Sequence, residues 1–142
     1  MKIKTILLAE DNQNDIDLTI LALSEYNLAN NIEVTNDGVE VIEYLRRQGK
    51  FEGRKPGNPA AILLDLKMPR MDGIEVLKVI KNDPVLKVIP VVMVTSSREE
   101  KDLVESYSLG VNAYVVKPVD FKQFIDAIKQ VGSFWAVLNE LP

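Results

Sequence analysis

A short apolar run that ends in a single acid constrains this chain more than any other feature. Residues Ala61–Leu64 are all apolar, lie between Pro59 and Pro69, and are followed at once by Asp65. A run of this length and composition is typical of a strand buried on both faces of a parallel sheet. Because the carboxyl ends of such strands form the ligand crevice of an open sheet, Asp65 is predicted to lie there. Taken alone, Asp65 could be a metal ligand, a nucleophile or a solvated strand end.

Each of three further apolar segments is followed at once by side chains suited to phosphoryl or metal chemistry. They are Thr5–Ala9 before Glu10 and Asp11, residues 90–94 before Thr95, and Ala113–Val116 before Lys117. If these strand ends were merely exposed to solvent, we would not expect one to end in two acids, one in an acid, one in a hydroxyl and one in an amine. A strand followed by a helix, repeated five times, predicts a doubly wound α/β domain in which helices cover both faces of a five-stranded parallel sheet.

The expected helices are marked by apolar residues at helical spacing. They cover about residues 16–26, 41–47, 74–82, 103–109 and 121–131, and a short additional strand is expected at 32–35. With 142 residues, the chain is expected to form one domain over 1–142, with an extension of the last helix and a tail at about 132–142. Residues 48–59 contain three glycines and two prolines and are predicted to be a long loop, either a solvated insertion or a partner contact.

Composition excludes several classes of function. The net charge of −4 and the absence of a basic stripe argue against a nucleic-acid partner. No apolar run approaches the roughly 18 residues of a membrane span, and no signal-peptide pattern opens the chain, so a soluble cytoplasmic protein is expected. The chain has no histidine and no cysteine, which excludes an imidazole base, a thiolate site and a histidine-ligated zinc.

Carboxylates gathered at adjacent strand ends repel one another unless a cation lies between them. Glu10, Asp11 and Asp65 offer oxygen ligands, a set that favours Mg²⁺ with several retained waters. Lys117 offers a point charge and Thr95 a hydroxyl for phosphoryl oxygens. This constellation suits phosphoryl transfer onto a carboxylate, although Lys117 could also form a structural ion pair with Asp65.

In this order, the motifs resemble the receiver domain of two-component response regulators. The matching features are the acid pair at 10–11, Asp65 with Met68-Pro69 and Asp72-Gly73, Thr95-Ser96, and Lys117-Pro118. The resemblance extends from Ile6 to about Val131 and implies the flavodoxin-like strand order 2-1-3-4-5 with five flanking helices. The long loop before the third strand and the ending from Gly132 resemble, more narrowly, the small receivers that partner bacterial and cyanobacterial phytochromes.

The resemblance also implies roles at the acidic end of the site. Asp65 would be the phosphoacceptor. Asp11 would bind Mg²⁺ directly and Glu10 largely through water, with Asp65 and the backbone carbonyl of Lys67 completing the protein ligands. The side chains of Lys67 and Ser97 occupy positions where receivers vary and where the phosphoryl lifetime is tuned.

On the other side of the phosphoryl group, the resemblance implies that Thr95 and Lys117 hold its oxygens. Ser96 would supply the small side chain that fits beside the phosphate. Tyr114, three residues before the lysine, matches the aromatic switch position. The bond between Lys117 and Pro118 would be cis, as in the family.

The resemblance implies a signalling switch, not an enzyme, that is phosphorylated by a sensor histidine kinase of the phytochrome type. The residues after Pro118 leave no room for a DNA-binding or catalytic output domain, so output is expected through contacts with a downstream protein. Apolar residues of the tail are predicted to form a homodimer or partner face, unless the tail folds back over its own domain: Phe134, Trp135, Val137 and Leu141.

Three other functions compete with this interpretation. A phosphatase of the haloacid-dehalogenase type requires a second acid two residues after its aspartate, where this chain has Lys67. A flavodoxin-like FMN carrier requires a glycine- and hydroxyl-rich phosphate loop after the first strand, where Glu10 and Asp11 would repel phosphate. A phosphate-independent binding module on the same fold is the third alternative.

Overall fold

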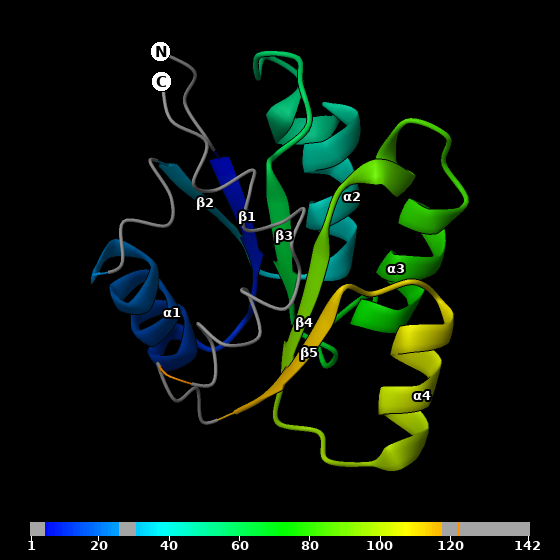
Figure 1. Ribbon diagram of the computed structural model, residues 1–142. Helices are drawn as coiled ribbons and strands as arrows, with labels where there is room; N and C mark the ends of the chain where they lie inside the picture. The colour runs from blue at the N-terminus through cyan, green and yellow to red at the C-terminus, as the bar shows by residue number, and fades with distance from the viewer. Residues whose placement is uncertain (1–4, 26–30, 118–121, 123–142) are drawn as a thin grey trace.

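A parallel sheet of five strands forms the centre of the computed structural model, which describes residues 5–25, 31–117 and 122. The strands are β1 (Thr5–Ala9), β2 (Asn31–Thr35), β3 (Ala61–Leu64), β4 (Val91–Thr95) and β5 (Ala113–Val116). They lie in the order β2-β1-β3-β4-β5, as the sequence predicted (Figure 1). The order reverses between β1 and β3, and this is where open α/β sheets bind ligands.

Four α-helices lie within the described residues: α1 (Gln13–Glu25), α2 (Gly38–Arg46), α3 (Gly73–Lys81) and α4 (Glu100–Ser108). Helix α1 covers one face of the sheet, α2 and α3 cover the other, and α4 lies beside α3 and β5 (Figure 1). The sequence predicted five helices, and the fifth, at about 121–131, falls outside the described residues except for the helical residue 122. The same is true of Pro118 and of the tail residues Phe134, Trp135, Val137 and Leu141.

Alternation along the strands explains why these segments are apolar at every position. Leu7, Ile62 and Met93 point to the face covered by α2 and α3, while Leu8 and Leu63 point to the face covered by α1. All five side chains are at most 2% exposed. Because both faces are covered, polar side chains of the three central strands are confined to the strand ends.

The long loop between α2 and β3 is anchored by Arg54. Its guanidinium lies 4.2 Å from the centre of the Tyr44 ring and donates to the carbonyl oxygens of Tyr44 at 2.9 Å and Gly57 at 3.0 Å. The loop also contains a short 3₁₀ helix, η1 (Gly49–Phe51), and a second one, η2 (Leu86–Val88), precedes β4. The predicted loop is therefore confirmed, and Arg54 ties it to the end of α2.

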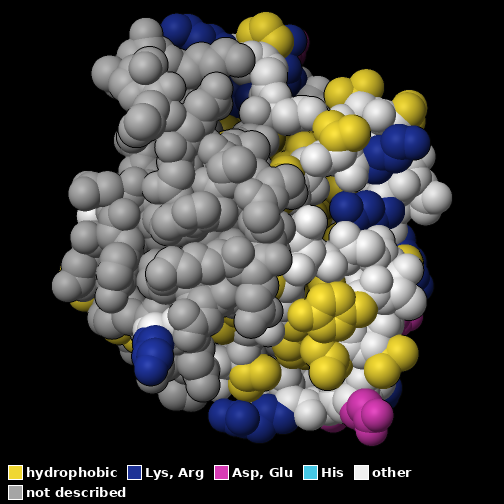
Figure 2. Space-filling model, in the orientation of Figure 1, with side chains coloured by type: hydrophobic (Ala, Val, Ile, Leu, Met, Phe, Trp, Pro, Cys, Tyr) yellow, Lys and Arg dark blue, Asp and Glu magenta, His cyan; other side chains and the backbone are white. Residues whose placement is uncertain are grey.

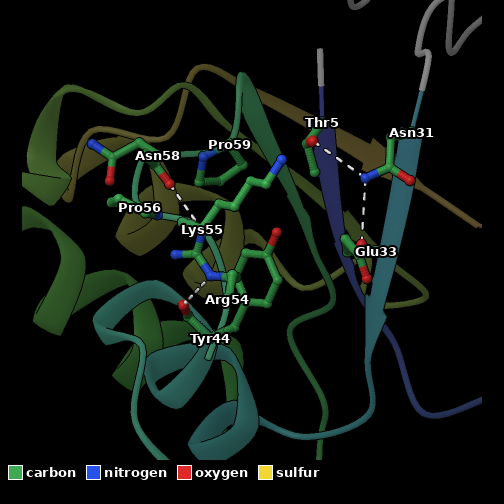
Figure 3. Close-up of a pocket in the computed structure, with 10 residues that line it drawn as sticks. Thr5, Asn31, Glu33, Tyr44, Arg54, Lys55, Pro56, Asn58 and Pro59 are labelled. Atoms are coloured by element: carbon green, nitrogen blue, oxygen red, sulfur yellow. Dashed lines mark hydrogen bonds between the residues drawn. The ribbon is translucent and has the colours of Figure 1, made fainter. Parts of the chain in front are cut away.

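A pocket of about 380 Å³ opens between this loop and the amino ends of β1 and β2 (Figure 3). Thr5, Asn31 and Glu33 line one side, and Lys55 reaches across from the loop. Because Thr5 and Asn31 begin their strands, the pocket lies at the end of the sheet opposite Asp65, which follows the carboxyl end of β3.

Two loops at the carboxyl end are joined by an ion pair. Arg70, in the loop after β3, donates from Nε and Nη2 to both carboxylate oxygens of Asp37 at 2.8–3.0 Å. Asp37 is also the N-cap of α2, because its Oδ1 accepts from the backbone N–H of Glu40 at 2.8 Å. Burial acts to raise the pKa of Asp37, but the Glu40 N–H and the Arg70 guanidinium outweigh it and hold that pKa below its ordinary value.

Replacing Asp37 is expected to destabilise the fold through both contacts. Asp37→Ala should lower the free energy of unfolding at pH 7 by about 1–2 kcal/mol, while Asp37→Asn should lose less because its amide oxygen still caps the helix. Since the folded pKa is depressed, the difference between wild type and Asp37→Ala is complete above the ordinary pKa of 3.8 and shrinks as the pH falls below it. Urea unfolding at several pH values measures this, and equal losses in both variants would contradict the capping role.

Candidate functional site

Four of the side chains predicted from separate strand ends meet at the carboxyl edge of the sheet, namely those of Glu10, Asp11, Asp65 and Lys117. Parallel register places Ala9 beside Leu64, so Glu10 and Asp65 emerge next to each other. The sheet's hydrogen bonding continues one residue beyond the strands: the Asp65 N–H donates to Ala9 O at 3.0 Å, and the Lys117 N–H donates to Thr95 O at 2.8 Å. The backbone that carries each functional side chain is thereby held by the sheet itself.

The Lys117 ammonium lies at the centre of this cluster. Its Nζ donates to Asp15 Oδ2 at 2.9 Å, to Asp65 Oδ2 at 3.3 Å and to the Glu10 carboxylate. A lysine ammonium has three N–H donors, so each one has a carboxylate acceptor. The Lys117 side chain is only 9% exposed, which means that its charge is balanced mainly by these acids and only slightly by water.

Burial and charge shift the pKa values of the paired groups. Burial raises the pKa of Glu10 to about 7, the Asp65 carboxylate acts in the same direction, and the hydrogen bond from Lys117 opposes both. Burial acts to lower the pKa of Lys117, but its hydrogen bonds to Glu10 and Asp15 raise it well above its ordinary value. Lys117 therefore stays charged at every physiological pH, whereas Glu10 takes up a proton near neutral pH more readily than an ordinary glutamate.

Three of the acids are close enough together to share a metal ion. Glu10, Asp11 and Asp65 each offer a carboxylate oxygen, and the three oxygens lie within 4.8 Å of one another. Glu10 and Asp65 are buried, whereas Asp11 is exposed, so the cluster opens to solvent on one side. An oxygen-only set with an open side fits a hard divalent cation that keeps some of its waters.

Backbone N–H groups orient two of these carboxylates. Glu10 Oε2 accepts from the N–H groups of Asp11 at 3.1 Å and Asn12 at 3.2 Å. Asp65 Oδ1 accepts from the N–H of Lys67 at 3.3 Å, while its other oxygen accepts from Lys117. The Lys67 side chain is exposed. Its carbonyl as a metal ligand and its side chain as a determinant of phosphoryl lifetime stay predictions.

The residues at the end of β4 lie on the strand next to that of Asp65. Thr95 is fully buried, and its Oγ1 accepts from the Ser97 N–H at 3.2 Å, while Ser96 is exposed. The Ser97 hydroxyl donates to Asp102 Oδ2 at 2.6 Å, which ties this loop to α4. The Tyr114 hydroxyl donates to the Ser97 carbonyl oxygen at 3.1 Å, so the predicted switch tyrosine and the β4–α4 loop are in direct contact.

Gly73 permits the close approach of α3 to the site. Its N–H donates to Leu66 O at 2.7 Å, and a Cβ at this position would lie 2.4 Å from the Asp65 carbonyl oxygen. Asp72 caps the helix by accepting from the Glu75 N–H at 2.8 Å. The Asp72-Gly73 pair of the sequence thus starts α3 directly against the backbone of Asp65.

Asp15 belongs to the cluster but was not predicted from the sequence. Residues 12–15 were interpreted as a polar turn with several N-cap candidates, and Asn12 does accept from the Asp15 N–H at 3.1 Å. The available signal was position, because Asp15 lies in the first turn of the helix that follows the acid pair at the end of β1.

A buried ammonium among acids at the reversal point of a 2-1-3-4-5 sheet is the arrangement that the sequence motifs predicted. The chain belongs to the response regulator receiver domain family, which it matches over residues 6–129. It is similar to response regulator Rcp1 of Synechocystis sp., with 38% identity over 139 residues, 98% of this chain and 93% of that protein.

Solved structures of phytochrome response regulators resemble the chain closely. The bacteriophytochrome response regulator RtBRR has a TM-score of 0.87 and 55% identity, covering 99% of this chain and 85% of that one. The phosphorylated cyanobacterial phytochrome response regulator RcpA has a TM-score of 0.81 and 40% identity, covering 99% of each chain. The chain is therefore a receiver-domain response regulator related to those of phytochromes, a class of signalling proteins that are generally not enzymes.

A metal-bound relative agrees with the acidic cluster. The Mn²⁺-bound form of Rcp1 has a TM-score of 0.80 and 37% identity, covering 98% of this chain and 97% of that one. Together with the acids of this chain, this fits a divalent metal site in a receiver domain. Over the residues that the structure describes, no helix is both long and apolar enough to cross a bilayer.

Removing the charge of Asp11 should weaken metal binding without disturbing the fold, because this side chain is exposed. We expect Asp11→Asn to raise the dissociation constant for Mg²⁺ and for Mn²⁺ about tenfold or more. The matched control is Asp17→Asn, which removes an equally exposed charge from α1, where Asp17 pairs with Gln13. Isothermal titration calorimetry compares the variants, and equal weakening in both would show that only net charge matters.

Adding one methyl group at Gly73 should strain the backbone of the acid loop. Gly73→Ala is expected to lower the free energy of unfolding by about 1–3 kcal/mol, since the opposing atom is a backbone carbonyl that cannot rotate away. Gly53→Ala provides the control, because a Cβ there meets nothing within 4 Å and should change stability by less than about 0.5 kcal/mol. Chemical denaturation of the two variants tests this, and a neutral Gly73→Ala would disprove the close approach.

Proposed function

We propose that Asp65 is the phosphoacceptor of this response regulator, that its donor is the phosphohistidine of a phytochrome-type sensor kinase, and that the metal is Mg²⁺. The observation that carries the proposal is the single buried cluster in which Lys117 Nζ lies 3.3 Å from Asp65 Oδ2, beside the acids Glu10 and Asp11. Receiver domains accept phosphoryl groups from histidine kinases, and the proposal is supported by the contact between Asp65, as acceptor, and the positive charge of Lys117.

In the proposed reaction, a carboxylate oxygen of Asp65 attacks the phosphorus of the phosphohistidine. A new P–O bond forms, the P–N bond breaks, and the electron pair leaves with the imidazole of the kinase. Bound Mg²⁺ would supply charge neutralisation for the phosphoryl oxygens. Lys117 would take one of these oxygens, and Thr95, on the adjacent strand, would offer its hydroxyl to another.

The proposed output starts from the contact between Tyr114 and the β4–α4 loop. The phosphoryl group adds about −1.5 to −2 charges beside Thr95. Movement of Thr95 toward it would disturb the bond that the Thr95 hydroxyl accepts from Ser97, whose carbonyl holds the Tyr114 hydroxyl. A phosphoryl contact of a few kcal/mol is enough to shift such a two-state equilibrium.

Helix α4, which packs beside β5, exposes apolar side chains. Leu103, Val104 and Tyr107 on α4 are 37%, 59% and 50% exposed, and apolar side chains gather over α4 and β5 in Figure 2. We take this surface as the one whose protein contacts respond to phosphorylation. The action of the chain as a single-domain switch in the cytoplasm, and its homodimer through the tail, stay parts of the same proposal.

The test is chemical labelling of the acceptor. With Mg²⁺ and radiolabelled acetyl phosphate, wild type should form an acyl phosphate that hydroxylamine removes, and Asp65→Asn should remain unlabelled. Asp17→Asn, which alters an exposed acid away from the cluster, should label like wild type. Equal labelling of Asp65→Asn would refute the assignment, and absence of labelling in wild type would favour a phosphate-independent binding module.

A further inference from the structure

Asp15 has a closer contact with the central lysine than the proposed phosphoacceptor has. Lys117 Nζ lies 2.9 Å from Asp15 Oδ2 and 3.3 Å from Asp65 Oδ2. Asp15 is held in the first turn of α1 by the bond from its N–H to Asn12, and its side chain is 30% exposed. It is not one of the three acids whose oxygens lie within 4.8 Å of one another. The contact with Lys117 is therefore the interaction through which Asp15 acts on the site.

The number of donors on the ammonium makes Asp15 a competitor for it. All three N–H groups of Lys117 already have carboxylate acceptors, so a phosphoryl oxygen can bind only by displacing one of them. Glu10 is oriented by the two backbone N–H groups that its Oε2 accepts. Asp65 would itself carry the phosphoryl group, so it is not the acceptor that competes with it. Asp15, in α1, is therefore the acceptor that an incoming phosphoryl oxygen would displace.

Charge acts in the same direction as this competition. Asp15 is one of three carboxylates around one ammonium, and its negative charge also repels the phosphoryl oxygens. We propose that Asp15 is a positioning residue that holds Lys117 in the unphosphorylated arrangement and so opposes the phosphorylated state. This inference rests on the proposed role of Asp65 as phosphoacceptor.

The experiment measures binding of beryllofluoride, a phosphoryl mimic, at saturating Mg²⁺ by calorimetry in the full chain. Asp15→Asn should bind it about two- to fivefold more tightly than wild type, the range expected for losing one partly exposed ion pair. The matched control is Asp17→Asn, which removes the same charge from the same helix but makes its side-chain bond to Gln13. The acyl-phosphate lifetime should lengthen in Asp15→Asn and stay unchanged in Asp17→Asn.

Each outcome bears on a different claim. If Asp15→Asn binds the mimic no more tightly than Asp17→Asn, or more weakly, Asp15 does not restrain Lys117 and the inference is wrong. Thermal unfolding of each variant shows whether the helix start is intact, since a purely structural role would lower the melting temperature without tightening binding. If wild type fails to bind the mimic, or Asp65→Asn binds it equally well, the proposed function itself fails, independently of Asp15.

Discussion

The Lys117 ammonium is the charge on which the rest of the site depends. Glu10 and Asp65 are buried side by side, and such a pair would be unstable without a cation between them. Lys117 supplies that cation from β5, the far edge of the sheet, and so ties the last strand to the ends of β1 and β3. The same amine is the group that a phosphoryl oxygen would seek. Under the proposed function, the stability of the resting protein and its response to phosphorylation both depend on this side chain.

The sheet places these charges because its interior leaves no other position for them. Residues of β1 and β3 are buried on both faces, so polar side chains follow only where each strand ends, and parallel direction puts those ends at one edge. Two local contacts hold the loops at this edge close together. Gly73 lets α3 begin against the Asp65 carbonyl, and the Asp37–Arg70 pair joins the neighbouring loops.

The sequence predicted the contacts that follow from the pattern of apolar residues. It did not predict those that depend on the conformation of a loop. Strands β1, β3 and β5 were predicted with the bounds that the structure has. In a parallel sheet whose two faces are covered by helices, a short apolar run forms a buried strand that ends where the apolar residues end. Asp15 was missed because its polar neighbours resemble an ordinary helix cap. The anchoring of Arg54 on Tyr44 was also missed, since it depends on how a glycine-rich loop turns back, and spacing carries no information about that.

The unequal exposure of the two neighbouring acids has a consequence for timing. Glu10 is 3% exposed and faces the lysine, whereas Asp11 stands in solvent at the mouth of the cluster. A small cation or donor can therefore enter and leave past Asp11 by diffusion, without any backbone segment having to open. In the proposed reaction, entry of the cation or donor would therefore not limit the rate of phosphorylation, which would depend on bond making at Asp65.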